Sequence, residues 1–191
     1  MKNTKILIMH TGEVKRISPI VVFLYVIVIY CTIPFAPYFV DFLRSIFKNN
    51  YGSFVSGLII SFIIFIAIKS IDYLRTPRTF FWFLFLSFSG VFILITLDIP
   101  AERIHFIEYA FLSYIIILTV GVEKREKYII TFLLGSIIGF GDELIQLFFQ
   151  YQRIFDLPRR YFEWKDVGMN VFGVFLGCVF YRYVIEEGKK K

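Results

Sequence analysis

The sequence predicts an all-α, polytopic membrane protein with about six transmembrane helices. Of its 191 residues, 58% are hydrophobic and 19% are charged, whereas soluble domains average roughly 45–50% and about 25%. The apolar residues form six long runs, and a helix needs about 20 apolar residues to cross a bilayer. This composition excludes a disordered chain and disfavours a soluble globular protein.

Hydropathy places the six helices at residues 17–35, 54–71, 79–97, 105–122, 128–149 and 166–185. Residues 1–16 are expected to form a cytoplasmic segment, residues 17–185 a single transmembrane domain, and residues 186–191 a basic cytoplasmic tail. Apolar residues also recur at helical spacing from Phe39 to Phe47, opposite Asp41 and Arg44. This pattern predicts a short amphipathic helix on the outer surface.

The distribution of basic residues predicts the orientation. Two thirds of the 21 lysines and arginines fall on the side of the two termini. Cytoplasmic loops carry an excess of these residues, so both termini are expected in the cytoplasm. The net charge of +6 follows from this bias, and no nucleic-acid partner is expected.

Three segments carry ionisable or amide side chains within or beside the apolar runs. They contribute His105, Glu108 and Tyr109; then Asp142, Glu143 and Gln146; and finally Asp166 and Asn170. Spacings of three and four place each set on one helical face, and the topology brings all three to the outer leaflet. A charged side chain costs about 2.5 kcal/mol or more at the bilayer centre and is functional by default. We therefore predict an outward-facing polar pocket.

Structural interpretations of the same residues stay open. Asp166 could cap a helix, and His105 could be a satisfied interfacial histidine. Arg153, Arg159 and Arg160 lie in an aromatic-rich loop. They could contact an anionic head group as part of a lid, belong to an interfacial belt, or neutralise the carboxylates in an ion-pair network.

Glycines recur every four residues in the last two predicted helices. They are Gly135 and Gly139 in the fifth helix, and Gly173 and Gly177 in the sixth. Small residues at this spacing let membrane helices approach closely. We expect these two helices to pack glycine face against glycine face.

The three polar segments together resemble the VanZ-like family of small bacterial membrane proteins over about residues 98–180. The family pattern is acid-Lys-x-x-His-x-x-x-Tyr, then Asp-Glu-x-x-Gln, then an Arg-bearing loop and Asp-x-x-x-Asn-x-x-Gly. Here the matching segments begin at Glu102, Asp142 and Asp166. Arg103 stands where lysine is common, Glu108 is an extra acid, and the loop is longer than usual. The resemblance implies the bacterial cytoplasmic membrane and, from the family's namesake, teicoplanin resistance; it implies no settled reaction.

Binding of an amphiphile with a polar head, such as a lipid-linked cell-wall precursor, a phospholipid or a lipoglycopeptide, is the favoured function. The alternative is an intramembrane hydrolase or transferase acting on phosphate- or ester-linked lipids, with His105, Asp142, Glu143 and Asp166 as candidate catalytic residues. The same four could instead hold a divalent metal, although no cofactor or metal is predicted. A proton relay ranks last, because the ionisable groups cluster at one leaflet. Membrane lipids are the expected partners.

Overall fold

The computed structural model describes residues 17–97, 100, 102–120, 125–152 and 162–190. These residues form helices and turns and contain no strand, which confirms the all-helical fold. The long helices are α1 (Pro19–Thr32), α3 (Tyr51–Ser70), α4 (Pro77–Thr96), α5 (Glu102–Thr119), α6 (Glu126–Gln152) and α7 (Trp164–Phe180). The shorter elements are α2 (Ala36–Phe47), η1 (Lys48–Asn50), η2 (Ile71–Tyr73), η3 (Tyr181–Glu186) and α8 (Glu187–Lys189). A helix thus covers each of the six predicted segments.

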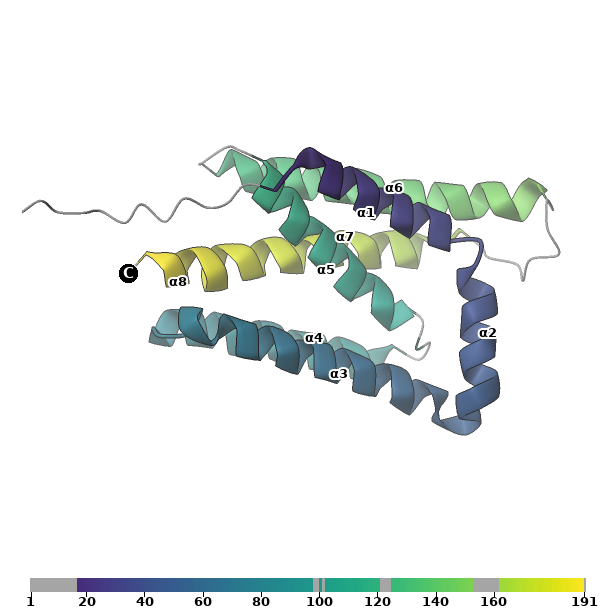
Figure 1. Cartoon of the computed structure of the whole chain (residues 1–191), viewed down its shortest axis with the longest axis horizontal. Coiled ribbons are helices and arrows are strands. Elements are labelled where there is room, and N and C mark those ends of the chain that lie inside the picture. Colours follow the sequence, from purple (N-terminus) through teal and green to yellow (C-terminus); the bar gives the residue numbers. More distant parts are fainter. Residues whose placement is uncertain (1–16, 98–99, 101, 121–124, 153–161, 191) are drawn as a thin grey trace, which may run out of the picture.

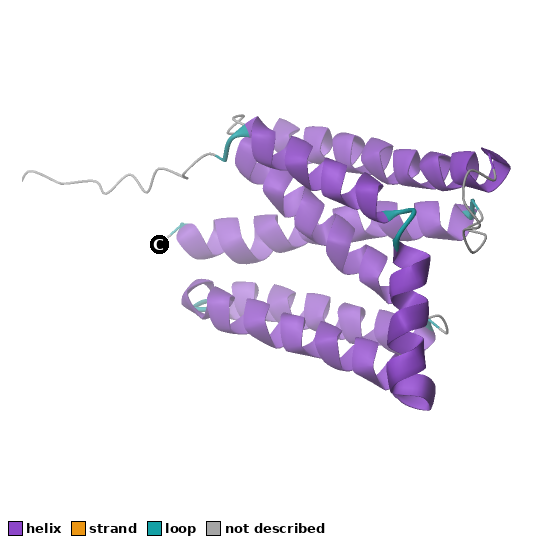
Figure 2. Ribbon diagram, turned by 45° about the vertical axis from the view of Figure 1, so that its right-hand side comes forward, coloured by secondary structure: helices purple, strands orange, loops and turns teal. Residues whose placement is uncertain are grey.

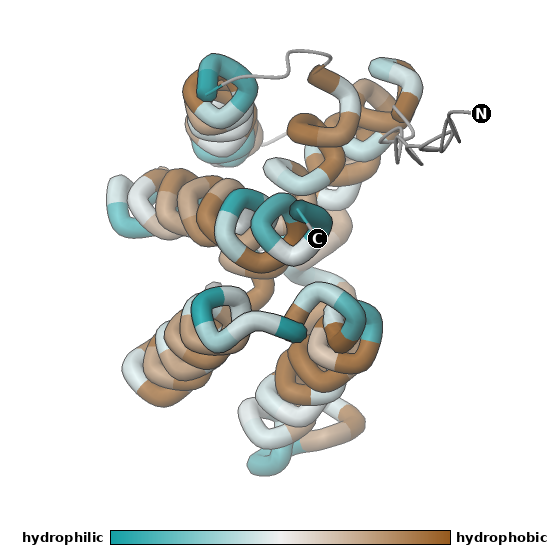
Figure 3. Tube along the Cα trace, turned by 90° about the vertical axis from the view of Figure 1, so that its left-hand side faces the viewer, coloured by the Kyte–Doolittle hydropathy of each residue, from teal (hydrophilic) through white to brown (hydrophobic). Residues whose placement is uncertain are grey.

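Three helical stretches in the described part of the chain are long and apolar enough to cross a membrane. They are Ala36–Tyr73, Glu126–Phe149 and Trp164–Lys189, and Pro19–Thr32 and Pro77–Ile93 are shorter apolar helices. Large apolar side chains cover the outside; Phe88 is 71% exposed and Ile95 is 76% exposed. Figure 3 shows that hydrophilic residues gather at the helix ends. Apolar exposure of this extent is typical of a membrane-facing surface.

Local sequence signals explain where several helices begin. The Ser18 side chain accepts a hydrogen bond from the Ile20 amide, and proline follows it at the first helical position of α1. Thr76 and Thr79 form a capping box at the start of α4. Both arrangements satisfy amide groups that have no partner inside the helix.

The predicted amphipathic segment is the helix α2, and Figure 1 shows that it runs across the direction of the other helices. The chain turns from α2 into α3 at Lys48, which has a positive φ of 46°. This turn lies at the end of the molecule where α5 and α7 begin. The helix itself is confirmed; its position on the outer membrane surface stays a prediction.

The core forms where α5 packs between α6, α7 and α1 (Figures 1 and 2). Its largest fully buried apolar side chains include Tyr109 and Leu112 of α5 and Val174 of α7. A Cβ atom at Gly173 would lie 2.9 Å from the Phe106 carbonyl oxygen. Backbone of α5 and α7 therefore approaches closely, as small residues permit.

The prediction that the two glycine faces pack against each other is wrong. Gly135 and Gly139 of α6 do face α7, but they receive the side chains of Val174 and Asn170, each 2.8 Å from the position of a Cβ atom. Gly173 faces α5 instead. The physical reason is that the space left by a glycine is filled by a larger side chain of the neighbouring helix. Helix α7 therefore presents Val174 and Asn170 to the glycines of α6, and its own glycine face packs against α5.

Helices α3 and α4 lie on the opposite side of α5 from α6 (Figures 1 and 2). Helix α4 packs against α7 and η3, where the ring of Trp82 stacks on that of Tyr183 with 4.3 Å between the ring centres. Arg103 of α5 connects both to the core. Its Nη1 donates to Ser56 Oγ of α3 at 2.7 Å, and its Nε and Nη2 donate to the Leu97 carbonyl oxygen at the end of α4, at 3.1 and 2.6 Å. One guanidinium therefore holds three helices together.

Replacing Arg103 with glutamine should lower the free energy of unfolding by about 2 kcal/mol, because hydrogen bonds to a charged group are lost. Arg103→Lys should be destabilising as well, since an ammonium lacks the planar fork. Thermal unfolding of the purified chain in detergent measures this. Arg44→Gln is the control: its guanidinium is 3.9 Å from Asp41 in an exposed pair, and such pairs contribute about 0–1 kcal/mol. Equal effects of the Arg103 and Arg44 variants would contradict the interpretation.

Candidate functional site

A buried acidic cluster lies where α5 and α7 begin and α6 approaches its end, on the right of Figure 1. Asp142 is 2% exposed, Glu143 0% and Gln146 3%, all on α6. Tyr109 of α5 and Asn170 of α7 are both 0% exposed. The structure thus brings together residues from all three predicted polar segments.

Hydrogen bonds join the cluster across helices. The Tyr109 hydroxyl donates to Asp142 Oδ2 at 3.0 Å. Gln146 Nε2 donates to Glu143 Oε1 at 2.7 Å and makes a longer contact of 3.5 Å with Asp142 Oδ1. The Glu163 amide lies 3.4 Å from Glu143 Oε2. Within the described part of the chain, neutral donors contact both carboxylates, and hydrogen bonds to charged groups are stronger than those between neutral groups.

His105 and Glu108 form the accessible edge of the site. Their side chains are 15% and 26% exposed, and His105 Nδ1 lies 3.9 Å from Glu108 Oε2. They sit one turn apart on α5, on the side from which Tyr109 reaches the buried carboxylates.

Asn170 contributes an acceptor inside the cluster. Its Nδ2 donates to the Gly139 carbonyl oxygen at 3.1 Å, across the close contact between α6 and α7. Its Oδ1 is buried and receives no hydrogen bond from the described residues. Buried polar groups are normally satisfied, so this oxygen is suited to a donor from a bound molecule or a water.

Aromatic side chains lie beside the cluster. The rings of Phe162 and Trp164 are 5.0 Å apart and nearly perpendicular. Phe140 stacks on Trp164 and meets Phe162 edge to face. Trp164 is 72% exposed. Exposed tryptophan at a helix start is typical of the boundary between membrane and water.

The remaining predicted residues have different outcomes. Asp166 lies in the first turn of α7, at the same end of the bundle. Arg153, Arg159 and Arg160 lie outside the described residues. Arg103 belongs to the helix-joining contacts rather than to the acidic cluster.

Two tyrosines of α1 were missed by sequence reasoning. The Tyr30 hydroxyl donates to the Ile138 carbonyl oxygen at 2.9 Å, and the Tyr25 hydroxyl lies 3.3 Å from the Glu108 carbonyl oxygen. The sequence signal for them was the presence of two tyrosines, five residues apart, on an otherwise apolar helix. It did not identify α1 as the neighbour of the site, because the contacts join residues far apart in the chain.

The described part of the site is a buried, acidic cluster with a partly exposed edge at His105 and Glu108. Within the described part of the chain, no three His, Cys, Asp or Glu side chains are placed to hold a metal ion. The sequence matches no protein-family model, and no curated protein and no solved structure is similar to it. The VanZ-like resemblance therefore stays a prediction from the sequence motifs.

Proposed function

We propose that the chain is a VanZ-like integral protein of the bacterial cytoplasmic membrane that binds the polar head of an amphiphile at the outer leaflet. In this proposal six helices span the membrane and both termini are cytoplasmic. The convergence of buried acidic and amide side chains from α5, α6 and α7 carries the proposal. Such residues are rare in membrane helices and mark binding or transport sites.

The chemistry of the cluster favours a head group that donates hydrogen bonds. Asn170 Oδ1 is a buried acceptor that receives no hydrogen bond from the described residues, and Glu108 adds a partly exposed carboxylate. Hydroxyl, amine and amide groups complement such acceptors. A lipid-linked saccharide–peptide precursor of the cell wall or a lipoglycopeptide carries these groups together with an apolar chain.

The aromatic neighbours support an amphiphile rather than a fully water-soluble ligand. Trp164 and Phe140 are exposed next to the polar groups. Rings at this level of a membrane protein contact both lipid and the polar boundary. A ligand anchored in the outer leaflet would present its head to His105 and Glu108 from the side. Contribution to teicoplanin resistance follows if the ligand is teicoplanin or its cell-wall target.

Replacing Glu108 with glutamine should weaken binding by about tenfold or more, because a charge-assisted hydrogen bond is lost. The assay titrates the purified chain in nanodiscs with teicoplanin and with a lipid-linked disaccharide–peptide precursor. Glu143→Gln tests the buried part of the cluster. Glu163→Gln is the matched control, since that side chain is exposed and only its backbone contacts the cluster.

The expected result is binding of one probe that falls in Glu108→Gln and Glu143→Gln but not in Glu163→Gln. Absence of binding of both probes to the wild-type chain would contradict the proposal. An equal loss in the control variant would also contradict it. In a susceptible bacterium, expression of the wild-type chain should raise teicoplanin tolerance and expression of the Glu108→Gln chain should not.

The alternative is an intramembrane hydrolase or transferase acting on phosphate- or ester-linked lipids. The observation that favours it is the proximity of the His105 and Glu108 side chains, 3.9 Å apart, next to two buried carboxylates. Histidine and carboxylate side chains can act as general acid and base. Mass spectrometry of the lipids recovered from the binding assay distinguishes the two, because catalysis leaves a cleaved or transferred product.

A further inference from the structure

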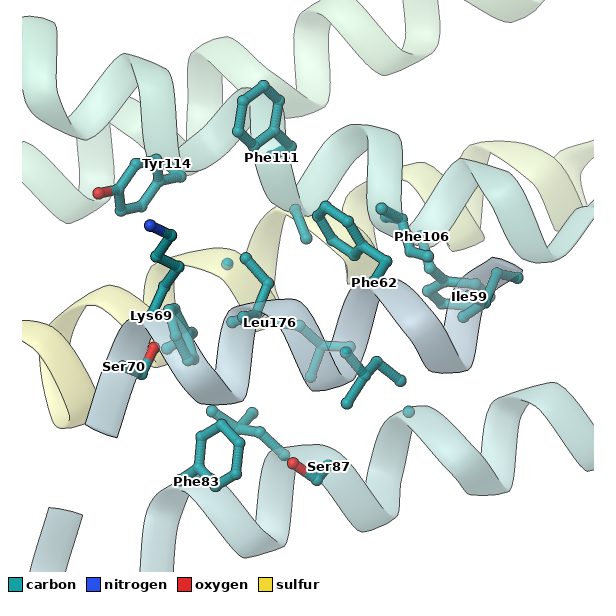
Figure 4. Close-up of a pocket in the computed structure, with 18 of the residues that line it drawn as sticks. Ile59, Phe62, Lys69, Ser70, Phe83, Ser87, Phe106, Phe111, Tyr114 and Leu176 are labelled. Atoms are coloured by element: carbon teal, nitrogen blue, oxygen red, sulfur yellow. The ribbon is translucent and has the colours of Figure 1, made fainter. Parts of the chain in front are cut away.

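A cavity lies on the other side of α5 from the acidic cluster. Its volume is about 390 Å³, and it is bounded by α3 and α4 on one side and by α5 and α7 on the other (Figure 4). Aromatic and aliphatic side chains form the walls, among them Phe62, Phe83, Phe106, Phe111 and Leu176. Its size falls within the range of about 300–1,000 Å³ that is typical of ligand sites.

The cavity is elongated along α3, from Ile59 to Lys69. These two positions are ten residues apart, which corresponds to about 15 Å at about 1.5 Å per residue. This length is half of the hydrocarbon core of a bilayer, which is about 30 Å thick. The length of this apolar cavity therefore matches that of one acyl chain within one leaflet.

Two basic residues line the cavity, and they differ in what their charges already contact. Arg103 donates from three nitrogens to the Leu97 carbonyl oxygen and the Ser56 hydroxyl. Lys69 Nζ lies 5.8 Å from the centre of the Phe65 ring, and none of the ion pairs between described residues includes it. In Figure 4 the Lys69 ammonium points away from α3 into the space that Tyr114 also lines.

We propose that this cavity, the Lys69 cleft, holds an acyl chain of an anionic phospholipid whose phosphate pairs with Lys69. The charge of Lys69 selects an anionic head group, and the apolar walls select the chain. The lipid head would lie at the end of the bundle that contains η2 and α8, opposite the acidic cluster. The proposal is independent of the function proposed for that cluster, because no residue of the cluster lines the cleft.

The test uses the purified full chain in detergent and a phosphatidylglycerol probe with a pyrene-labelled acyl chain. Energy transfer from tryptophan to pyrene reports binding. Pyrene-labelled phosphatidylcholine with the same chain is the comparison without net charge, because its quaternary ammonium neutralises the phosphate. Lys69→Gln should weaken phosphatidylglycerol binding by about fivefold, the contribution of one basic residue near an anionic membrane surface. Arg75→Gln is the matched control, because Arg75 is at the same end, is exposed, and pairs with Asp72.

A second pair of variants tests the apolar part of the cleft. Gly90 lines the cleft, and a Cβ atom there would have only Ile63 Cδ1 within 4 Å, at 3.8 Å. Gly90→Leu should therefore fill the cleft without disturbing the fold and should weaken probe binding. Gly57→Leu is the control, since Gly57 is exposed on α3 with nothing within 4 Å of its Cβ position.

The proposal predicts tighter binding of phosphatidylglycerol than of phosphatidylcholine, with losses in Lys69→Gln and Gly90→Leu and none in the two controls. Equal binding of both lipids would overturn it, as would equal losses in Lys69→Gln and Arg75→Gln. Unchanged binding in Gly90→Leu would overturn the placement of the chain. Competition by soluble glycerol phosphate as effective as that by the unlabelled lipid would show a phosphate site without an acyl chain and would also overturn it.

Discussion

Replacing Gly177 with leucine is expected to prevent the normal packing of α7 against α5. A Cβ atom at this position would overlap the Ser113 hydroxyl and the Ala110 carbonyl oxygen of α5. The obstructing atoms include helix backbone, which cannot rotate away as a flexible side chain can. We expect a loss of about 3 kcal/mol or more of unfolding free energy, at or above the upper end of the range for overpacked cores.

Fluorescence-detected size-exclusion chromatography of the full chain after stepwise heating measures this loss. Gly168→Leu is the matched control on the same helix, because Gly168 is exposed and has nothing within 4 Å of its Cβ position. The control should elute and melt like the wild-type chain. If Gly177→Leu did the same, α5 and α7 would not approach as closely as the structure indicates.

Replacing Gln146 with glutamate is the second change with a large expected effect. Gln146 donates to Glu143 and lies near Asp142 while being 3% exposed. The new side chain would replace a donor with a third acid in the same buried space. An uncompensated buried charge costs about 3–5 kcal/mol, so we expect a strongly lowered melting temperature.

Gln146→Met separates the added charge from the lost amide. Methionine has a similar length and no charge, so this variant removes the amide without adding a charge and should be destabilised by about 1–3 kcal/mol. The melting temperatures should therefore fall in the order wild type, Gln146→Met, Gln146→Glu. Equal stability of Gln146→Glu and the wild-type chain would contradict the description of Gln146 as a hydrogen-bond donor within a buried acidic cluster.

The helical segments could be predicted from the sequence because apolar runs are a local property. Helices begin and end within a few residues of the six predicted ranges, and α2 follows from the spacing between Phe39 and Phe47. The last helical run continues to Lys189 rather than ending at residue 185. It passes through the π-helical turn η3, a change in hydrogen-bond register that hydropathy does not detect.

The residues of the candidate site could be predicted from the sequence, but their arrangement in space could not. Spacing placed His105, Glu108 and Tyr109 on one helical face. The structure shows that they differ in burial. Tyr109 is fully buried and its hydroxyl donates to Asp142, whereas His105 and Glu108 are partly exposed. Helical periodicity shows in which direction a side chain points from its own helix. How deeply that side chain is buried depends on how closely the neighbouring helices approach. The role of Arg103 was missed for the same reason.

The sequence by itself determined an all-helical protein with long apolar segments and three polar segments that belong at one end of the molecule. Only the tertiary structure decided which helices meet. It placed glycines of α6 opposite Val174 and Asn170, used Arg103 to hold α3 and α4, and left an apolar cleft next to Lys69. The physical reason is that α3 and α4 are apolar on nearly all sides, so their sequences specify burial in lipid without specifying a partner.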